Sequence, residues 1–481
     1  MKTTIVRVGL AGAVHPNMPG DDTGLYSRIA AALEALSLSE GFELRVFRDP
    51  IRSEADGVAA RDFMDSNQVD LTLLFNASLP FGRIILPLAR VKSAIGLWSV
   101  PEPTSSGVLQ LNSFCGTNML GSIIANYLRE HDIRFKWFYG MPEEAAFLER
   151  FRITLRALKA VKTLRTARIG QIGGLANGFE NLYFDERVLE KKFGTYLQTR
   201  HTVEEIVARA QAIPDAAVKD DLKVLGKAGK IETGRLAVEQ LEKSSRVYLA
   251  LKDFAQENDY SSLAVSCWSR FQEAYGIAVC AAMSRLNEDG IATPCEADVV
   301  SAVTMLILNA LNGQKSSLND LVAFDRSDDS INLWHCGVAP ACWADERGVV
   351  WDNHFNIGEH QGCTWCGKGV VADMGFKKGP ITVSCMNNDF DDLFILTGEI
   401  LDGKKGYSGS SGWVGKLEID GAPVGHDDLM NTLVVQRVNH HYAAAFGNLT
   451  NELNEFAAWT GLNVIGKVPY KPYMQNKPRR L

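Results

Sequence analysis

The chain has 481 residues, more than one hydrophobic core normally organises, so two or three domains are expected. Its 46% hydrophobic and 22% charged residues are typical of a soluble globular protein and exclude extensive disorder. The net charge of -7 gives no general attraction for nucleic acid or anionic lipid, and no stretch approaches the roughly 18 apolar residues of a membrane span. A cytoplasmic protein without nucleic-acid or membrane partners is therefore the expectation.

The first third of the chain alternates short apolar strands with amphipathic helices. Strands are predicted at 4–10, 43–48, 69–75 and 94–100, with helices at 25–38 and 55–67. Arg7 interrupts the first apolar run, which therefore fits a strand better than a signal peptide. The alternation predicts a parallel sheet covered by helices, in an α/β domain over residues 1–165.

A second α/β unit is predicted to begin near Arg168 and to extend over residues 166–345. Its first strand runs into Gly173 and Gly174, but the G-x-G-x-x-G spacing of a dinucleotide site is absent. After about residue 345 the sequence changes to short β-rich segments broken by glycine. A third, β-rich domain is therefore predicted over residues 346–481.

Nine cysteines are scattered along the chain, and their odd number suits free thiols in a reducing compartment. Cys363 and Cys366 have the C-x-x-C spacing of a zinc or redox motif. No second C-x-x-C pair completes a four-ligand site. A structural zinc at this pair is kept as the minor alternative.

Two acidic residues accompany the most apolar helix of the sequence. Residues 291–313 are apolar on nearly every predicted face, with Pro294 where the helix starts and Gly313 where it ends. Glu296 and Asp298 are predicted to open this buried helix. Acids in a first turn often only complement the helix dipole. A carboxylate removed from water, however, needs a cation, a metal or a catalytic task, and both interpretations stay open.

A second acid and a histidine follow this helix. Asp320 lies just before an apolar strand, and His335 lies on the β-like run 331–337. Glu296, Asp320 and His335 could meet at one end of a sheet, where ligands bind in open α/β folds. Two carboxylates and an imidazole favour Mn²⁺ or Mg²⁺, with Co²⁺, Fe²⁺ or Ni²⁺ as substitutes, over a thiolate-selected metal.

Six of the nine histidines come after residue 330. Residues 434–447 are predicted to form one strand, in which His440 and His441 face opposite sides and at most one points at a given metal. The isolated histidines of this half are interpreted as core residues hydrogen-bonded to the backbone. They are His354, His360 and His426.

Six sequence motifs, taken together with their order and spacing, resemble those of one superfamily. They are CWSRFQEAYGIAVC at 267–280, LNEDGIATPCEAD at 286–298, LWHCGVAP at 333–340, LWSVPEP at 97–103, SFCG at 113–116 and HHYAAAFG at 440–447. Over nearly its full length the chain resembles the L-fucose isomerase and L-arabinose isomerase superfamily.

The resemblance implies two Rossmann-like α/β domains, 1–165 and 166–345, followed by a barrel-like β-rich domain, 346–481. It also implies a homohexamer, or a smaller homo-oligomer, with active sites near subunit interfaces. Its members are metal-dependent aldose-ketose isomerases of free sugars.

The resemblance also assigns metal ligands. Glu296 and, 24 residues on, Asp320 match the two carboxylates, and the distance to Gly447 favours His441 as the third ligand, with His440 as a substrate contact. His335 matches a histidine that arabinose-type members add to the metal shell, so its role stays open. Mn²⁺ is the expected ion, with Mg²⁺ or Co²⁺ as alternatives.

The expected reaction moves a carbonyl from C1 to C2 through a cis-enediol, with Glu296 and Asp320 as general base and acid. A metal-assisted hydride shift stays open. Substrate contacts are predicted at His15 and Asn17 in the loop after the first strand, at Trp98, and at Trp413 at the end of the glycine-rich run 406–413.

Two rival functions are kept. One is a catalytically silent sugar-binding or regulatory member of the superfamily, which the carboxylates and the His pair argue against. The other is an NAD-dependent dehydrogenase, which the missing glycine spacing argues against. The sugar itself stays open among pentoses, deoxyhexoses and C6-modified hexoses such as sulfoquinovose, because the amino-terminal loop lacks the arginine of fucose-type members.

Overall fold

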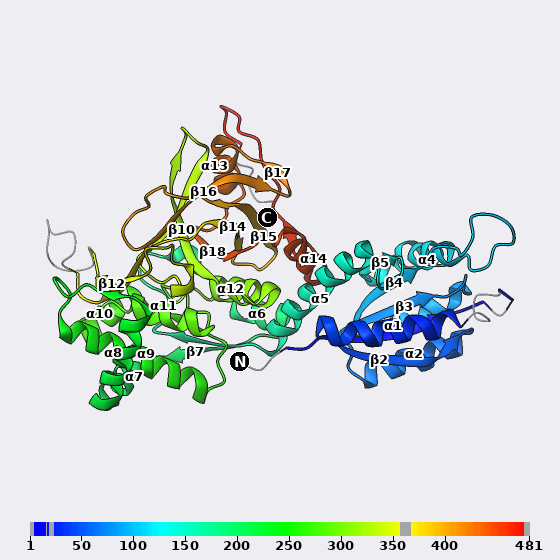
Figure 1. Ribbon diagram of the computed structural model, residues 1–481, viewed down its shortest axis with the longest axis horizontal. Coiled ribbons are helices and arrows are strands. Elements are labelled where there is room, and N and C mark those ends of the chain that lie inside the picture. The colour runs from blue at the N-terminus through cyan, green and yellow to red at the C-terminus, as the bar shows by residue number, and fades with distance from the viewer. Residues whose placement is uncertain (1–3, 16, 19–23, 356–366, 476–481) are drawn as a thin grey trace. The chain divides into compact units, whose positions relative to one another are not determined.

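A computed structural model describes residues 4–15, 17–18, 24–355 and 367–475. The chain divides into two compact units, Lys2–Lys162 and Thr163–Leu481 (Figure 1). Among the described residues, no helix combines the length and the apolar run that crossing a bilayer requires.

The small unit is built on a five-stranded parallel sheet of order β2-β1-β3-β4-β5. Its central strand β3 is buried along its whole length, as a strand covered on both faces should be. The strands are β1 (Arg7–Ala13), β2 (Glu43–Ile51), β3 (Leu71–Asn76), β4 (Ala94–Ser99) and β5 (Phe135–Tyr139). The helices are α1 (Leu25–Glu40), α2 (Glu54–Ser66), α3 (Ile85–Leu88), α4 (Ser113–Ser122) and α5 (Ala145–Thr166). The predicted parallel α/β sheet is confirmed.

The large unit begins with a three-stranded parallel sheet of order β7-β6-β9. Its strands are β6 (Arg168–Ile172), β7 (Tyr196–His201) and β9 (Ser262–Val265). The accompanying helices are α6 (Glu186–Phe193), α7 (Val203–Ala212), α8 (Asp215–Ala228), α9 (Val238–Glu257), α10 (Gln272–Tyr275), α11 (Cys280–Asp289) and α12 (Val299–Asn312). Two Rossmann-like domains stay a prediction, because this second parallel sheet is short.

A large mixed sheet forms the rest of this unit. The central strands follow the order β15-β14-β18-β10-β11-β16, and a pairing of β15 with β16 closes them into a six-stranded ring. They are β10 (Ser317–Asp325), β11 (Ser330–His335), β14 (Gly379–Met386), β15 (Asp392–Ile400), β16 (Ser410–Ile419) and β18 (His441–Phe446). The ring is extended by β8 (Lys230–Ile231), β12 (Val350–Asn353), β13 (Val370–Gly375), β17 (Ala422–Pro423) and β19 (Asn463–Val464). The helices α13 (His426–Val435) and α14 (Thr450–Thr460) complete the unit. β10 and β11 precede residue 345 in the sequence but share this sheet with strands that follow it. The predicted division at residue 345 stays a prediction.

The apolar helix predicted within residues 291–313 is α12, and nearly all of its side chains are buried. Asp298 is its N-cap, and Gly313 ends it in the left-handed conformation with φ 70°. The helix therefore begins after Glu296. The expectation that Glu296 belongs to the first turn is wrong, because the side chain of Asp298, not that of Glu296, accepts the amide of Ser301.

A buried ion pair joins α8 and α11 and gives a testable stability effect. Arg285 Nη1 donates to Asp221 Oδ2 at 2.7 Å, and both side chains are largely buried. Arg285→Met is expected to lower the free energy of unfolding by about 3 kcal/mol, because it leaves the Asp221 charge buried without its cation. Urea unfolding measures this loss.

The matched control is Arg187→Met, since Arg187 pairs with Asp185 at an exposed site and should leave the free energy of unfolding nearly unchanged. Equal losses in the two variants would contradict a special role for the buried pair.

Candidate active site

The predicted ligands gather where β18, β10 and β11 run side by side. Asp320 on β10 lies directly opposite His441 on β18 and opposite Trp334 on β11. Directly opposed residues of antiparallel strands have their side chains on one face, about 5 Å apart at Cβ. The strand register therefore brings Asp320 and His441 together.

Glu296 reaches this place from the loop before α12. It and Ala297 both adopt the left-handed conformation, with φ of 54° and 56°. Such a backbone costs about 1–3 kcal/mol per non-glycine residue and persists only where neighbouring contacts hold it. The loop is held because Ala297 N donates to Val265 O and Gln171 Nε2 donates to Ala297 O, each at 3.0 Å.

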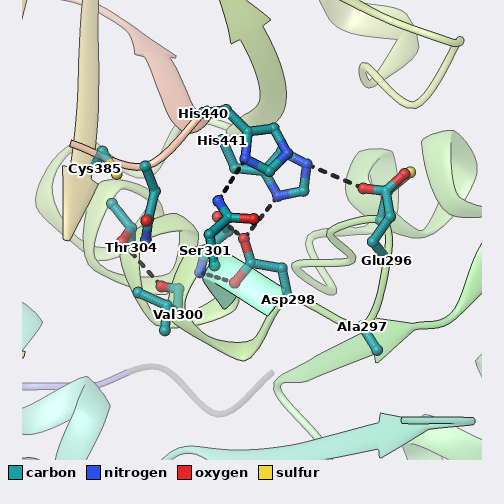
Figure 2. A network of polar contacts seen from close by, with 12 residues as sticks. Glu296, Ala297, Asp298, Val300, Ser301, Thr304, Cys385, His440 and His441 are labelled. Carbon is teal, nitrogen blue, oxygen red and sulfur yellow. Dashed lines mark hydrogen bonds and ion pairs between the residues drawn. The ribbon is translucent and has the colours of Figure 1, made fainter. Parts of the chain in front are cut away.

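His441 is the centre of the cluster and is almost fully buried. Its Nε2 lies 3.1 Å from Glu296 Oε2 and 3.8 Å from Asp320 Oδ1. Its Nδ1 lies 2.9 Å from Asp298 Oδ2, so the ring stands between two carboxylates (Figure 2). Because Nδ1 donates to Asp298, Nε2 is the ring nitrogen that faces Glu296 and Asp320.

The pKa shifts follow from these contacts. Burial lowers the pKa of His441, but Asp298 and Glu296 outweigh it and raise that pKa well above its ordinary value. Burial raises the pKa of Asp298, yet hydrogen bonds from His441 and Ser301 bring it below the ordinary range. Burial raises the pKa of Asp320, and the charge of Glu296 adds to this.

His335 stands at the edge of the same cluster. Its Nε2 lies 3.9 Å from Glu296 Oε2, and Glu296, His335 and His441 each offer an atom within 4.8 Å of the others. The backbone amide of Cys336 donates to His335 Nδ1 at 2.9 Å. Burial lowers the pKa of His335, but Cys336, Asp320 and Glu296 together raise it to about 10.

Two buried oxygens at this place have no hydrogen-bond partner among the described residues, namely Glu296 Oε2 and Asp320 Oδ1. Although Glu296 Oε2 lies 3.1 Å from His441 Nε2, the angles are not those of a hydrogen bond. Buried polar atoms are seldom left without a partner. Two such carboxylate oxygens beside an imidazole nitrogen fit a divalent ion that prefers oxygen and nitrogen ligands, such as Mn²⁺ or Mg²⁺.

No family model matches the chain. Comparison with known proteins finds relatives that all carry the same name. A sulfoquinovose isomerase of Priestia aryabhattai is 26% identical over 412 residues, which are 83% of this chain and 86% of that protein. The sulfoquinovose isomerase of Alkalicoccus urumqiensis is 27% identical, covering 77% and 79%. That of Clostridium sp. (strain MSTE9) is 29% identical, covering 66% and 69%.

The chain is an isomerase. Membership in the L-fucose and L-arabinose isomerase superfamily stays a prediction. Among solved structures, solute-binding proteins of ABC transporters from Burkholderia multivorans and Actinobacillus succinogenes are 9% and 11% identical, with TM-scores of 0.18 and 0.17. They align with 65% and 64% of this chain and with 95% and 92% of their own chains.

The two adjacent histidines of the isomerase correct one prediction. The expected strand 434–447 is wrong before residue 441, because α13 extends to Val435 and β18 begins only at His441. His440 therefore precedes the strand and does not obey its alternation. The two rings lie 4.2 Å apart, and both offer a nitrogen within 4.8 Å of an Asp320 oxygen and of each other. They do not face opposite sides.

His440 forms one side of the cluster and is positioned by neighbours that the sequence did not reveal. Its Nδ1 lies 2.9 Å from Asn181 Nδ2, and Phe179 stacks on its ring at 5.7 Å. Asn388 Nδ2 donates to Asn181 O, and Asn439 Nδ2 to Asn388 Oδ1. Asn388 and Asn439 also line a cleft of about 950 Å³. This chain of amides connects His440 to the cleft.

The other predicted substrate contacts are His15, Asn17, Trp98 and Trp413. His15, Asn17 and Trp98 lie in the small unit, and Trp98 is fully buried, with its Nε1 donating to Gly140 O. Asn17 is exposed, and its backbone amide donates to His15 Nδ1. Trp413 lies on β16 with Lys404 Nζ 4.0 Å from its ring centre. Their roles toward a substrate stay predictions.

The remaining candidates have the following places. His354 and His426 are buried and hydrogen-bonded to backbone carbonyls, as predicted. His360, Cys363 and Cys366 lie outside the described residues. Asp298 is not among the site residues predicted from the sequence. Its position at a helix start, two residues after Glu296, is the sequence feature that could have indicated its role.

Proposed function

We propose that this isomerase interconverts an aldose and a ketose of a free sugar, with Mn²⁺ held by Glu296, Asp320 and His441. The observation that carries the proposal is a pair of buried carboxylate oxygens beside His441 Nε2, neither of which has a hydrogen-bond partner among the described residues. His335 is a further ligand candidate at the edge of the same cluster. Mg²⁺ or Co²⁺ would suit the same donors.

The reaction requires a base that takes the proton from C2 and an acid that returns one to C1, by way of a cis-enediol. Glu296 and Asp320 are the proposed base and acid, because both lie beside His441 Nε2 and could therefore reach the neighbouring C1 and C2 of one sugar. When bound, the divalent ion supplies the positive charge that offsets negative charge developing on O1 and O2. His440, held by Asn181 and Phe179, would orient a substrate hydroxyl.

Sulfoquinovose is the first substrate to test, since relatives that cover most of this chain carry the name sulfoquinovose isomerase. Ketose formation from a panel of D- and L-aldoses, including deoxy and C6-sulfonated sugars, can be followed by NMR with Mn²⁺ present. We expect turnover of one panel member that a chelator abolishes and Mn²⁺ restores. A panel without ketose and a protein that binds no divalent ion would overturn the proposal.

The same assay in deuterated water tests the proton transfer. Under initial-rate conditions the enediol route places solvent deuterium at C1 of the ketose. Complete absence of deuterium would favour a hydride shift instead.

A homo-oligomer is also proposed, with the hexamer as the expected form.

Metal binding is predicted to release a proton. The pKa of His441 is raised by Asp298 and Glu296, so the metal-free ring is protonated at neutral pH and must lose a proton to donate its Nε2 lone pair. Mn²⁺ affinity should therefore rise with pH from 6 to 8, by up to about tenfold per unit. Calorimetry in two buffers of different protonation enthalpy counts the released proton. A pH-independent affinity would contradict the assignment of His441.

A further inference from the structure

A second group of ligand atoms lies beside the proposed active site and has a different chemistry. The thiols of Cys280, Cys295 and Cys336 are free and buried. Cys280 is the first residue of α11, Cys336 follows β11, and Cys295 lies in the loop before α12. Three separate segments thus bring sulfur atoms to one place in the core.

The spacing of these sulfurs suits a tetrahedral ion. Cys280 Sγ lies 3.5 Å from Cys336 Sγ. Two thiolates bound to one tetrahedral Zn²⁺ at about 2.3 Å would stand about 3.8 Å apart. One nitrogen of His354 lies within 4.8 Å of both sulfurs, so a small closing movement would bring all three atoms onto one ion.

His354 supplies an independent observation. Its side chain is fully buried, and Nδ1 donates to Phe355 O at 2.6 Å. Nε2 has no hydrogen-bond partner within the part of the chain that the structure describes. A ring whose Nδ1 is held by a backbone carbonyl has the Nε2 lone pair available, which is the usual arrangement of a metal-binding histidine.

We propose that Cys280, Cys336 and His354 bind a thiolate-preferring divalent ion, Zn²⁺, with Cys295 as the fourth ligand. Cys295 Sγ lies within 4.8 Å of Cys336 Sγ, so Cys336 connects it to the other two residues. Two or three sulfurs and an imidazole select a softer ion than the oxygen-rich site of Glu296 and Asp320 does. The ion would be structural and would tie the loop carrying Glu296 to β11 and β12.

Cobalt distinguishes the two sites. The full-length protein is stripped of metal, kept anaerobic with a phosphine reductant, and titrated with Co²⁺. Cobalt bound by thiolates in tetrahedral geometry gives sulfur-to-cobalt charge-transfer absorption in the near ultraviolet and intense visible bands. Cobalt at the carboxylate site gives neither. We expect the thiolate signature at one equivalent, and its displacement by Zn²⁺.

Variants assign the signal to residues. Cys280→Ser and His354→Gln should each lose or strongly change the thiolate signature. The control Cys385→Ser should keep it, because Cys385 is also buried but its sulfur contacts Met386 O. Glu296→Gln should keep it as well, so this test does not depend on the proposed function. Wild-type protein without the signature, or a signature that survives both Cys280→Ser and His354→Gln, would overturn the proposal in favour of a metal-free thiol cluster.

Discussion

Glu296→Gln is expected to reduce the rate of isomerisation by about 10³-fold or more, with the fold intact. Glutamine keeps the size of the side chain but removes the negative charge, so the site loses a metal ligand and a general base together. The loop around residue 296 is held by backbone contacts of Ala297, which the substitution leaves in place. Initial rates with saturating Mn²⁺ on the substrate found by the NMR panel measure the effect.

The matched control is Glu346→Gln, since Glu346 is an exposed acid of the same unit and should keep the wild-type rate. Mn²⁺ binding to both variants should be measured alongside, because loss of a ligand predicts weaker binding as well as slower turnover. A Glu296→Gln enzyme within threefold of the wild-type rate would show that this carboxylate neither holds the ion nor moves the proton.

Asp298→Asn is expected to weaken Mn²⁺ binding by about 10–100-fold, although Asp298 is not itself a proposed ligand. Its carboxylate accepts the Nδ1 proton of His441 and so fixes the tautomer that presents Nε2 to the ion. Asparagine retains one oxygen that can cap α12 through Ser301, but its amide group cannot accept in place of the second oxygen. The change therefore acts mainly on the orientation of His441.

Three measurements separate this positioning role from a general loss of stability. Calorimetry gives the Mn²⁺ affinity, and thermal unfolding should change little because Asn is a good N-cap. The ring-nitrogen NMR shifts of His441 report its tautomer and should change in Asp298→Asn. Unchanged Mn²⁺ affinity together with an unchanged tautomer would refute the role assigned to Asp298.

The sequence predicted the elements of the fold better than their assembly. Hydrophobic periodicity found four of the five strands of the small unit and α12, because those patterns are local, but it missed β5. The pairing of Asp320 with His441 joins strands far apart in the chain, and no local pattern encodes such a register. The ring closed by β15 and β16 was likewise anticipated only as a barrel-like β-rich region, through the resemblance.

The site shows the same limit at the scale of single residues. Glu296 was expected in a helical turn, but the left-handed backbone of Glu296 and Ala297 is a tertiary effect that helix-start signals do not reveal. His440 was expected to alternate with His441, and the early end of the strand removed the basis of that rule. The cysteines appeared scattered, since only the folded chain brings Cys280 and Cys336 together.

The closed ring of six strands has a consequence for how the site can move. A closed ring has no free edge from which β10 and β18 could unzip, so the spacing of Asp320 and His441 is set by the wall itself. Glu296 comes from a loop outside this ring, whose position depends on a few hydrogen bonds of Ala297 and not on strand pairing. Binding of an ion or a sugar should therefore be felt first as a change in amide exchange at residues 295–298, while the barrel strands stay protected.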